Sequence, residues 1–249
     1  MKLLAFDTST DSMSIAVCRD DGTAGGLWQQ QGAGGARASA GLIAEVLELM
    51  RQSGLRLSEL DAICFGCGPG SFTGLRTACA VAQGLAFGAG VPVLPVNSLL
   101  ALAEAARHSA LAGLAELQLS ALLDARMDEI YAAHFGFAHG QWRTLQATHL
   151  LRPEALALPA STPPGSVLPC VAAGNVFTVY GSRLGGLAQA MPRIEALPQA
   201  TAMLRLAPQL LAQGLAVSAA QALPTYIRDK VAQTTLERAA IKAAKALSP

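Results

Sequence analysis

A glycine-rich stretch in the first third of the chain restricts its possible folds more than any other feature. Residues 66–74 are Gly-Cys-Gly-Pro-Gly-Ser-Phe-Thr-Gly. They follow the apolar run Leu60–Phe65, which is typical of a buried strand, and precede an apolar face over Thr73–Phe87 that predicts a helix. Three glycines and one proline within five residues fix an unusual backbone path and let another molecule approach closely. Backbone N–H groups at such a helix start lack intrahelical partners.

The stretch matches none of the common phosphate-binding or nucleophile motifs. It lacks the Gly-Lys-Ser/Thr ending of a P-loop, and it misses the dinucleotide fingerprint because position 71 is serine. Pro69 stands where a Gly-x-Ser-x-Gly elbow requires glycine. The stretch is either a rigid connection, with Ser71 or Thr73 as the helix cap, or a loop that binds an anion or a partner carboxylate. The candidate positions are Gly68, Pro69, Gly70, Ser71, Thr73 and Arg76.

The composition indicates a globular protein with much apolar surface to bury. Its 249 residues suffice for one large domain or for two small lobes that share an interface. Hydrophobic residues make up 52% and charged residues 14%, so a partner can bury part of this surface. The net charge of +1 gives no electrostatic footprint for nucleic acid, so most phosphate contacts to any RNA would come from another molecule.

The N-terminal segment and the cysteines predict a cytoplasmic protein. Met1–Asp7 is too short and too soon charged for a signal peptide, and no apolar run reaches the ~18 residues of a membrane span. The five cysteines, an odd number without paired spacing, fit a reducing compartment. Cys64 and Cys67 form a CxxC pair, but no matching ligand pair exists for zinc, and Cys64 falls inside a predicted strand. Structural cysteines are therefore favoured.

The first half of the chain alternates between strand and helix patterns. Three strands come first, followed by helix, strand, helix, strand and helix. The strands are expected at Leu3–Phe6, Ser12–Arg19, Ala24–Gln31, Leu60–Phe65 and Val91–Val96. The helices are expected at Ser39–Ser53, Thr73–Phe87 and Ser98–Arg107.

The second half restarts this pattern, which indicates a duplicated lobe. Asp7 and Asp124 each end a strand and lie 117 residues apart, and the same offset separates Asp11 from Asp128. Strands are expected at Ala121–Asp124, Glu129–Phe137, Gln141–Leu150 and Val167–Ala173. Helices are expected at Pro153–Leu158, Ala200–Gly214 and, in the tail, Glu237–Ser248.

The loop Gly68–Arg76, Gly-Pro-Gly-Ser-Phe-Thr-Gly-Leu-Arg, resembles the hallmark of the TsaB family (older name YeaZ), a bacterial factor in the synthesis of threonylcarbamoyladenosine in tRNA. Ala38 departs from the family pattern where many relatives carry histidine, and Cys67 departs where relatives often carry arginine. Other stretches resemble the family in the right order along nearly the whole chain: Leu4–Thr10, Ala82–Ala86, Asp124–Tyr131 and Pro224–Arg228.

The resemblance implies a duplicated actin-like and sugar-kinase-like (ribonuclease H-like) α/β fold, with two lobes built from mixed sheets and helices. This agrees with the internal repeat. The expected division is an N-terminal lobe at residues 1–108, a C-terminal lobe at 109–231 and a helical or disordered tail at 232–249.

The resemblance also implies a scaffold and not a catalyst. In the family, TsaD transfers the threonylcarbamoyl group to the adenosine beside the anticodon of tRNAs that read ANN codons. TsaB pairs with TsaD through its N-terminal lobe, and the ATPase TsaE joins them, so tRNA is contacted only indirectly. A homodimer is possible in isolation. No metal or cofactor is expected, since no two of the four histidines are three or four residues apart.

Small residues on the predicted helix 74–88 suit a pairing role. Gly74, Ala78, Ala82 and Ala86 recur every four residues and form a shallow stripe that permits close approach of another helix. The alternative is that this stripe packs on the chain's own sheet. If the stripe is the interface, Ala82→Leu blocks pairing with TsaD and leaves the chain folded.

Asp7 and Asp124 are expected to face the cleft between the lobes. In actin-like ATPases such aspartates hold magnesium-bound water, so a nucleotide-dependent phosphotransferase or ATPase is the alternative function. Neither aspartate precedes a glycine-containing phosphate loop, which favours turn capping and pairing with donors such as Arg126. The M22-like peptidase activity once ascribed to the wider family has no support, since neither HExxH nor a Ser-His-Asp order is present.

Overall fold

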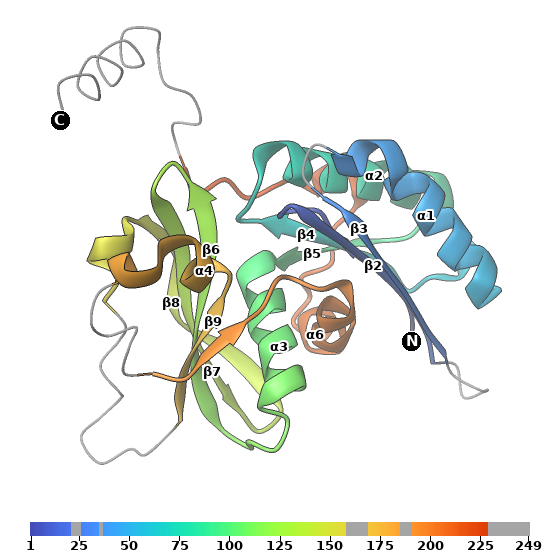
Figure 1. Ribbon diagram of the computed structural model, residues 1–249. Helices are drawn as coiled ribbons and strands as arrows, with labels where there is room; N and C mark the ends of the chain where they lie inside the picture. The colour runs from blue at the N-terminus through green and yellow to red at the C-terminus, as the bar shows by residue number, and fades with distance from the viewer. Residues whose placement is uncertain (21–25, 35–36, 158–168, 185–190, 229–249) are drawn as a thin grey trace, which may run out of the picture.

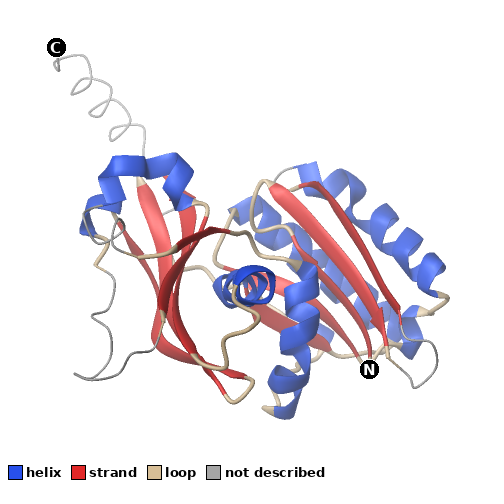
Figure 2. Ribbon diagram, turned by 60° about the horizontal axis from the view of Figure 1, so that its bottom comes forward, coloured by secondary structure: helices blue, strands red, loops and turns tan. Residues whose placement is uncertain are grey.

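The structure is a computed structural model that describes residues 1–20, 26–34, 37–157, 169–184 and 191–228. Two sheets stand side by side, with helices between them and on their outer faces (Figures 1 and 2). The predicted helix Glu237–Ser248 and the rest of the tail at 232–249 lie outside the described residues.

The first sheet has the strand order β3-β2-β1-β4-β5. Its first three strands form an antiparallel meander, whereas β1, β4 and β5 run parallel. Leu3 and Ala5 face one side of the sheet, Leu4 and Phe6 face the other, and all four are buried. Both faces of β1 are covered, which explains its uninterrupted apolar sequence. The strands are β1 (Lys2–Asp7), β2 (Ser12–Arg19), β3 (Gly26–Ala33), β4 (Ala62–Gly68) and β5 (Val93–Asn97).

The second sheet repeats this order as β8-β7-β6-β9-β10. Strands β6, β7 and β8 form an antiparallel meander, and β6, β9 and β10 run parallel. The duplicated two-lobed α/β fold predicted from the sequence is therefore confirmed. The strands are β6 (Leu117–Arg126), β7 (Glu129–Ala138), β8 (Gln141–Leu151), β9 (Cys170–Gly174) and β10 (Arg193–Glu195).

The offset of 117 residues predicted between the two repeats is wrong, because the true offset is even. In β1 the odd-numbered Ala5 packs into the core between the sheets, and in β6 the odd-numbered Ala121 does so. Side chains alternate between the faces of a strand, so an offset that preserves the face must be even, and 117 is odd. Asp7 and Asp124 therefore lie on opposite faces of their sheets and are not structural equivalents.

Helices cover both faces of the first sheet. Two long helices, α1 (Ala38–Ser53) and α2 (Phe72–Ala89), lie on its outer face, where they bury Leu4 and Phe6. Two others, α3 (Ser98–Ala110) and α6 (Ala200–Ala212), lie between the sheets and share one core with both. None of the helices in the described part of the chain is long and apolar enough to cross a membrane.

The outer face of the second sheet carries only short helical segments in the part of the chain that is described. The sequence did not predict α4 or β10, because segments of five and three residues are too short to show a periodicity. The short helices are α4 (Val176–Tyr180) and the 3₁₀ helices η3 (Pro153–Ala155) and η4 (Gly181–Leu184), with η2 (Leu57–Glu59) and η5 (Ala219–Gln221) elsewhere.

The chain returns to the first lobe after α6. We call residues 213–228 the C-terminal strap. Val217 exchanges two backbone hydrogen bonds with Val93 of β5, at 2.9 and 2.8 Å, and Gln83 of α2 donates to the carbonyl oxygen of Ala222 at 2.8 Å. The strap therefore contacts the first lobe, although the expected division places it within the C-terminal lobe at 109–231.

Candidate functional site

The glycine-rich loop packs tightly against the chain's own segments. Gly68, which precedes a cis peptide bond, has a φ of +123°, and Gly70 has a φ of +159°. A Cβ on Gly68 would lie 2.6 Å from the carbonyl oxygen of Thr225, and a Cβ on Gly70 would lie 2.5 Å from the Cβ of Ser9. These glycines let the strap and the turn after β1 come close, which supports the interpretation as a rigid connection.

Ser71 caps α2, as predicted. Its Oγ accepts a hydrogen bond from the backbone N–H of Gly74 at 3.5 Å, while its own N–H donates to the carbonyl oxygen of Ser9 at 2.7 Å. Thr73 is exposed, and its carbonyl oxygen accepts from the Thr77 hydroxyl. The first hydroxyl of the loop therefore positions the helix start, and the second is free to face the cleft.

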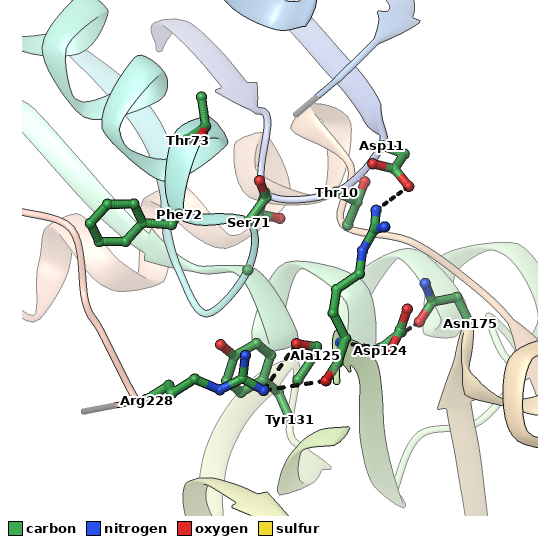
Figure 3. Close-up of a pocket in the computed structure, with 13 residues that line it drawn as sticks. Thr10, Asp11, Ser71, Phe72, Thr73, Asp124, Ala125, Tyr131, Asn175 and Arg228 are labelled. Carbon is green, nitrogen blue, oxygen red and sulfur yellow. Dashed lines mark hydrogen bonds and ion pairs between the residues drawn. The ribbon is translucent and has the colours of Figure 1, made fainter. Parts of the chain in front are cut away.

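A cavity of about 480 Å³ opens between the two lobes. The loop contributes Gly70, Ser71 and Thr73 to its lining, whereas Gly68, Pro69 and Arg76 do not line it. The other polar groups come from the turn after β1, from the second lobe and from the strap (Figure 3): Ser9, Thr10, Asp11, Asp124, Arg126, Tyr131, Asn175 and Arg228.

Two arginines connect the lobes across this cleft. The guanidinium of Arg126 pairs with Asp11 at 2.5 Å, and both side chains are mostly exposed. Arg228 of the strap pairs with Glu129 and donates to the carbonyl oxygen of Ala125 at 3.1 Å, and its side chain is only 13% exposed. Each arginine belongs to one side of the cleft and binds the other, so together they fix the separation of the lobes (Figure 3).

Asp7 lies in a closed hydrogen-bond network and not in the cleft. It is 1% exposed. Its Oδ1 accepts from the N–H and the hydroxyl of Ser9, at 2.8 and 2.6 Å, and its Oδ2 accepts from the Ser98 hydroxyl at 2.9 Å. Burial raises the pKa of Asp7, although these hydrogen bonds oppose the shift. The expectation that Asp7 faces the cleft is wrong, and its expected role in capping a turn is confirmed.

Asp124 does line the cleft. Its Oδ1 accepts from the backbone N–H of Arg126 at 2.8 Å and from the Tyr180 hydroxyl at 2.7 Å, and its own N–H donates to Asn175 at 2.8 Å. Burial and then the hydrogen bond to Asp124 raise the pKa of Tyr180 well above its usual range, so this hydroxyl remains a donor. The predicted pairing with Arg126 goes through the backbone, because the guanidinium binds Asp11.

Arg76 contacts the strap. Its guanidinium lies 3.7 Å from the centroid of the Phe72 ring, and its Nε donates to the Tyr226 hydroxyl at 3.1 Å. The rings of Phe72 and Tyr226 are 5.0 Å apart. Sequence reasoning gave no role to Tyr226 or Arg228. The only signal for them was the family-like stretch Pro224–Arg228, a conspicuous motif outside any periodic pattern.

The predicted stripe of small residues faces inward. Gly74, Ala78, Ala82 and Ala86 are all buried, and the three alanines share a core with Phe65 of β4. Packing on the chain's own sheet, which was the alternative interpretation, is therefore the one that the structure supports. A partner cannot reach this stripe in the folded chain, so Ala82→Leu is expected to disturb the core and not pairing alone.

The opposite face of α2 is exposed. Phe87 is 84% exposed, and nothing lies within 4 Å of a Cβ placed on Gly84 or Gly88. On the neighbouring α1, Ile43 and Leu47 are 50% and 48% exposed. Ala80, Gly84 and Gly88 also recur every four residues, so the helix has a second stripe of small residues, which the sequence-based prediction did not include. We call this surface the outer helix face: Ile43, Leu47, Ala80, Gly84, Phe87 and Gly88.

The cysteines are free thiols that are not arranged to bind a metal ion within the described residues. All five are free, and Cys64 and Cys67 are buried in β4. Burial raises the pKa of Cys64 to about 12 and that of Cys67 to about 11, so both are protonated at neutral pH and do not act as thiolates. Within the described ranges, no group of three or more His, Cys, Asp or Glu side chains could hold a metal ion.

The two sheets of equal strand order, with one pair of helices between them and a cleft where their lobes meet, define a duplicated two-lobed protein of the actin-like class. The comparisons narrow this class. A family model described as TsaD, the tRNA N6-adenosine threonylcarbamoyltransferase, matches residues 36–236.

Similarity to individual proteins extends over nearly the whole chain. The TsaB protein of Haemophilus influenzae, described as a tRNA threonylcarbamoyladenosine biosynthesis protein, is 34% identical, with 93% of this chain and 95% of that protein covered. The Escherichia coli TsaB protein is 30% identical over 93% and 96%. YeaZ from Pseudomonas aeruginosa superposes with a TM-score of 0.74 at 35% identity, over 90% of this chain and 99% of that chain. The chain therefore belongs to the TsaB (YeaZ) family.

Proposed function

We propose that this chain acts in the biosynthesis of N6-threonylcarbamoyladenosine in tRNA, as a non-catalytic partner of TsaD. The observation that carries the proposal is the nearly full-length similarity to two proteins named for this biosynthesis. The match of the TsaD family model supports a common ancestry of this chain and the transferase. Two related chains of one fold are suited to pair through matching elements.

The pairing surface that we propose is the outer helix face of the N-terminal lobe. Exposed apolar side chains that gather on one face mark protein interfaces, and here Ile43 and Leu47 of α1 and Phe87 of α2 are exposed on two helices that contact each other. Gly84 and Gly88 leave the α2 backbone uncovered, so a partner helix can approach it closely. This face replaces the buried stripe as the candidate for contact with TsaD.

The cleft supports a scaffold role. A phosphotransferase of the actin-like class would use the aspartate at the end of β1 to hold magnesium-bound water. Here Asp7 is 1% exposed and engaged by Ser9 and Ser98. The lining side chains also bind each other across the cleft, as Arg126 does with Asp11. Nothing in this arrangement favours the phosphotransferase alternative.

The remaining assignments follow from the same proposal. TsaE joins the TsaD complex, and the net charge of +1 leaves most tRNA contacts to the partners. The complex works in the cytoplasm, where free thiols persist. In the absence of TsaD, two copies of this chain pair through the outer helix face, because the same apolar surface then has no other cover.

The proposal is tested by depleting the protein in its own host and measuring tRNA nucleosides by mass spectrometry. Threonylcarbamoyladenosine is expected to fall while unrelated modified nucleosides persist, and re-expression of the wild-type chain is expected to restore it. An unchanged amount of threonylcarbamoyladenosine after complete depletion contradicts the proposal.

A further inference from the structure

A second cavity, of about 430 Å³, lies beside a buried carboxylate and shares no lining residue with the cleft. The carboxylate belongs to Glu104 of α3, which is 3% exposed. Arg107 donates to both of its oxygens at 2.7 and 2.9 Å, the indole Nε1 of Trp142 donates at 2.9 Å, and Nε of Arg205 donates at 2.8 Å. Helices α3 and α6 and strand β8 therefore meet at one charged group.

The Glu104 carboxylate accepts four hydrogen bonds, whereas the guanidinium of Arg205 has donors left over. Burial raises the pKa of Glu104, but the hydrogen bonds from Arg107, Trp142 and Arg205 and the charge of Arg107 together outweigh it and lower the pKa, so Glu104 is ionised at neutral pH. Arg205 uses only Nε, and within the described part of the chain its two Nη groups have no hydrogen-bond partner. A guanidinium carries five donors in a rigid fork, so a carboxylate on one edge leaves the other edge open.

The groove therefore has an unbalanced positive charge. One carboxylate faces two guanidiniums, and both arginines line the cavity. The walls are otherwise apolar or neutral on this side, with Phe137 under the guanidinium of Arg107 at 4.4 Å and Trp142 next to it. Aromatic walls that exclude water lower the local dielectric constant and so strengthen the attraction of a guanidinium for an oxyanion. The volume exceeds that of one ion and falls within the range of small-molecule sites, roughly 300–1,000 Å³.

We propose that this groove binds a phosphate group, either as inorganic phosphate or as part of a small phosphate monoester, through the free edge of Arg205 with support from Arg107. Phosphate matches the planar fork of a guanidinium and accepts two parallel hydrogen bonds. Glu104 acts as a positioning residue, because it holds both guanidiniums in place without touching the ligand. The proposal is independent of the function proposed above.

The chain provides its own reporter for the test. It has two tryptophans, Trp142 on Glu104 and Trp28 on β3 of the other lobe. The full-length protein, labelled with ¹⁵N, is titrated with inorganic phosphate and separately with glycerol 3-phosphate at constant ionic strength, and the indole N–H signals are followed by NMR. Trp142 is expected to shift and saturate while Trp28 does not move. Tighter binding of the monoester identifies an organic ligand, and equal affinity identifies phosphate itself.

Two variants that each remove one positive charge distinguish a specific phosphate site from a general electrostatic attraction of the protein surface for anions. Arg205→Met removes the proposed ligand fork but keeps an apolar stem over the groove, and it is expected to weaken binding about tenfold or more. Arg143→Met removes an exposed arginine of β8 outside the groove and is expected to change the affinity less than about twofold.

Thermal unfolding shows whether Arg205→Met folds. If it does not, Arg205→Lys is used in its place, because lysine keeps the charge and the ion pair with Glu104 but lacks the planar fork of a guanidinium. Weaker binding by Arg205→Lys is then the expected result. Equal losses in Arg205→Met and Arg143→Met, wild-type affinity in the folded Arg205 variant, or no saturation of the Trp142 shift at millimolar phosphate would each overturn the proposal.

Discussion

The two lobes share one sheet plan but differ in what covers their outer faces. The first sheet carries α1 and α2, with 16 and 18 residues, while the described residues on the second include an α-helix of five, α4. The inner layer is nearly symmetric, since α3 and α6 each have 13 residues and pack together between the sheets. Within the described residues, the two lobes therefore share the inner layer and differ in the outer one.

This difference places the proposed interface. A short helix such as α4 offers a partner little regular surface, whereas the longer α1 and α2 contact each other and carry exposed apolar side chains. Within α2 the same contrast recurs, because its inward face is built from alanines under β4 and its outward face from Ala80, Gly84 and Phe87. The inward face holds the fold together, and the outward face is available.

The largest stability effect is expected under the long helices. Phe65 of β4 is fully buried beneath α2, and Phe65→Ala should lower the free energy of unfolding by about 3–5 kcal/mol. Val176 of α4 is also fully buried, but Val176→Ala removes only two methyl groups and should cost about 1.5–2 kcal/mol. Urea unfolding measures both, and equal losses would show that the outer layers contribute alike.

The inward face of α2 is tested by Ala82→Leu. Ala82 is fully buried, so the larger side chain should overfill the core and lower the free energy of unfolding by about 1–3 kcal/mol. The protein that remains folded should still bind TsaD with wild-type affinity. Denaturation and pull-down are measured on one preparation. Normal stability combined with lost pairing would restore the inward stripe as the interface.

The two arginines that join the lobes should differ in strength. Arg228→Met removes a mostly buried guanidinium with several acceptors and should cost about 1.5–3 kcal/mol. Arg126→Met removes an exposed ion pair with Asp11 and should cost less than about 1 kcal/mol. A larger loss in Arg126→Met, measured by urea unfolding, would mean that the exposed pair and not the strap holds the cleft.

Much of the fold could be predicted because its elements are long enough to show a period. The strand predicted at Ser12–Arg19 has the bounds of β2. The helix predicted at Ser39–Ser53 starts one residue later than α1 does and ends at the same residue. The failures are the short α4 and β10, and the register of the repeat. The offset was counted from two aspartates and did not take into account that side chains alternate between the two faces of a strand. Which face of each strand meets the core is known only from the packed structure.

The site was harder to predict because its contacts are distant in sequence. Arg76 and Tyr226 are 150 residues apart, and nothing local shows that the strap returns to α2. The stripe on α2 failed for another reason. Both faces of this helix carry small residues every four positions, so the period identifies a face but not the side that meets the sheet.

The smallest effect concerns pH and the second lobe. His134 of β7 is buried between Gln118 and Ser120, and burial lowers its pKa from the ordinary 6.5. The unfolded chain therefore binds the proton more readily, so stability should be complete above about pH 6.5 and fall as the pH drops below it. His134→Gln should reduce this slope in urea unfolding at several pH values. An unchanged slope would assign it to other groups.

The central claim is that the outer helix face of the first lobe pairs with TsaD, and its most direct test is a binding measurement with matched variants. Phe87→Asp places a charge on this face, and Val179→Asp places one on α4, where Val179 is 54% exposed. Both variants should fold, since neither side chain is buried.

Isothermal titration of each variant with TsaD from the same host gives the dissociation constants. Phe87→Asp is expected to weaken binding by about 100-fold or more, and Val179→Asp by less than about twofold. Wild-type affinity in Phe87→Asp, or a comparable loss in Val179→Asp, would contradict the account.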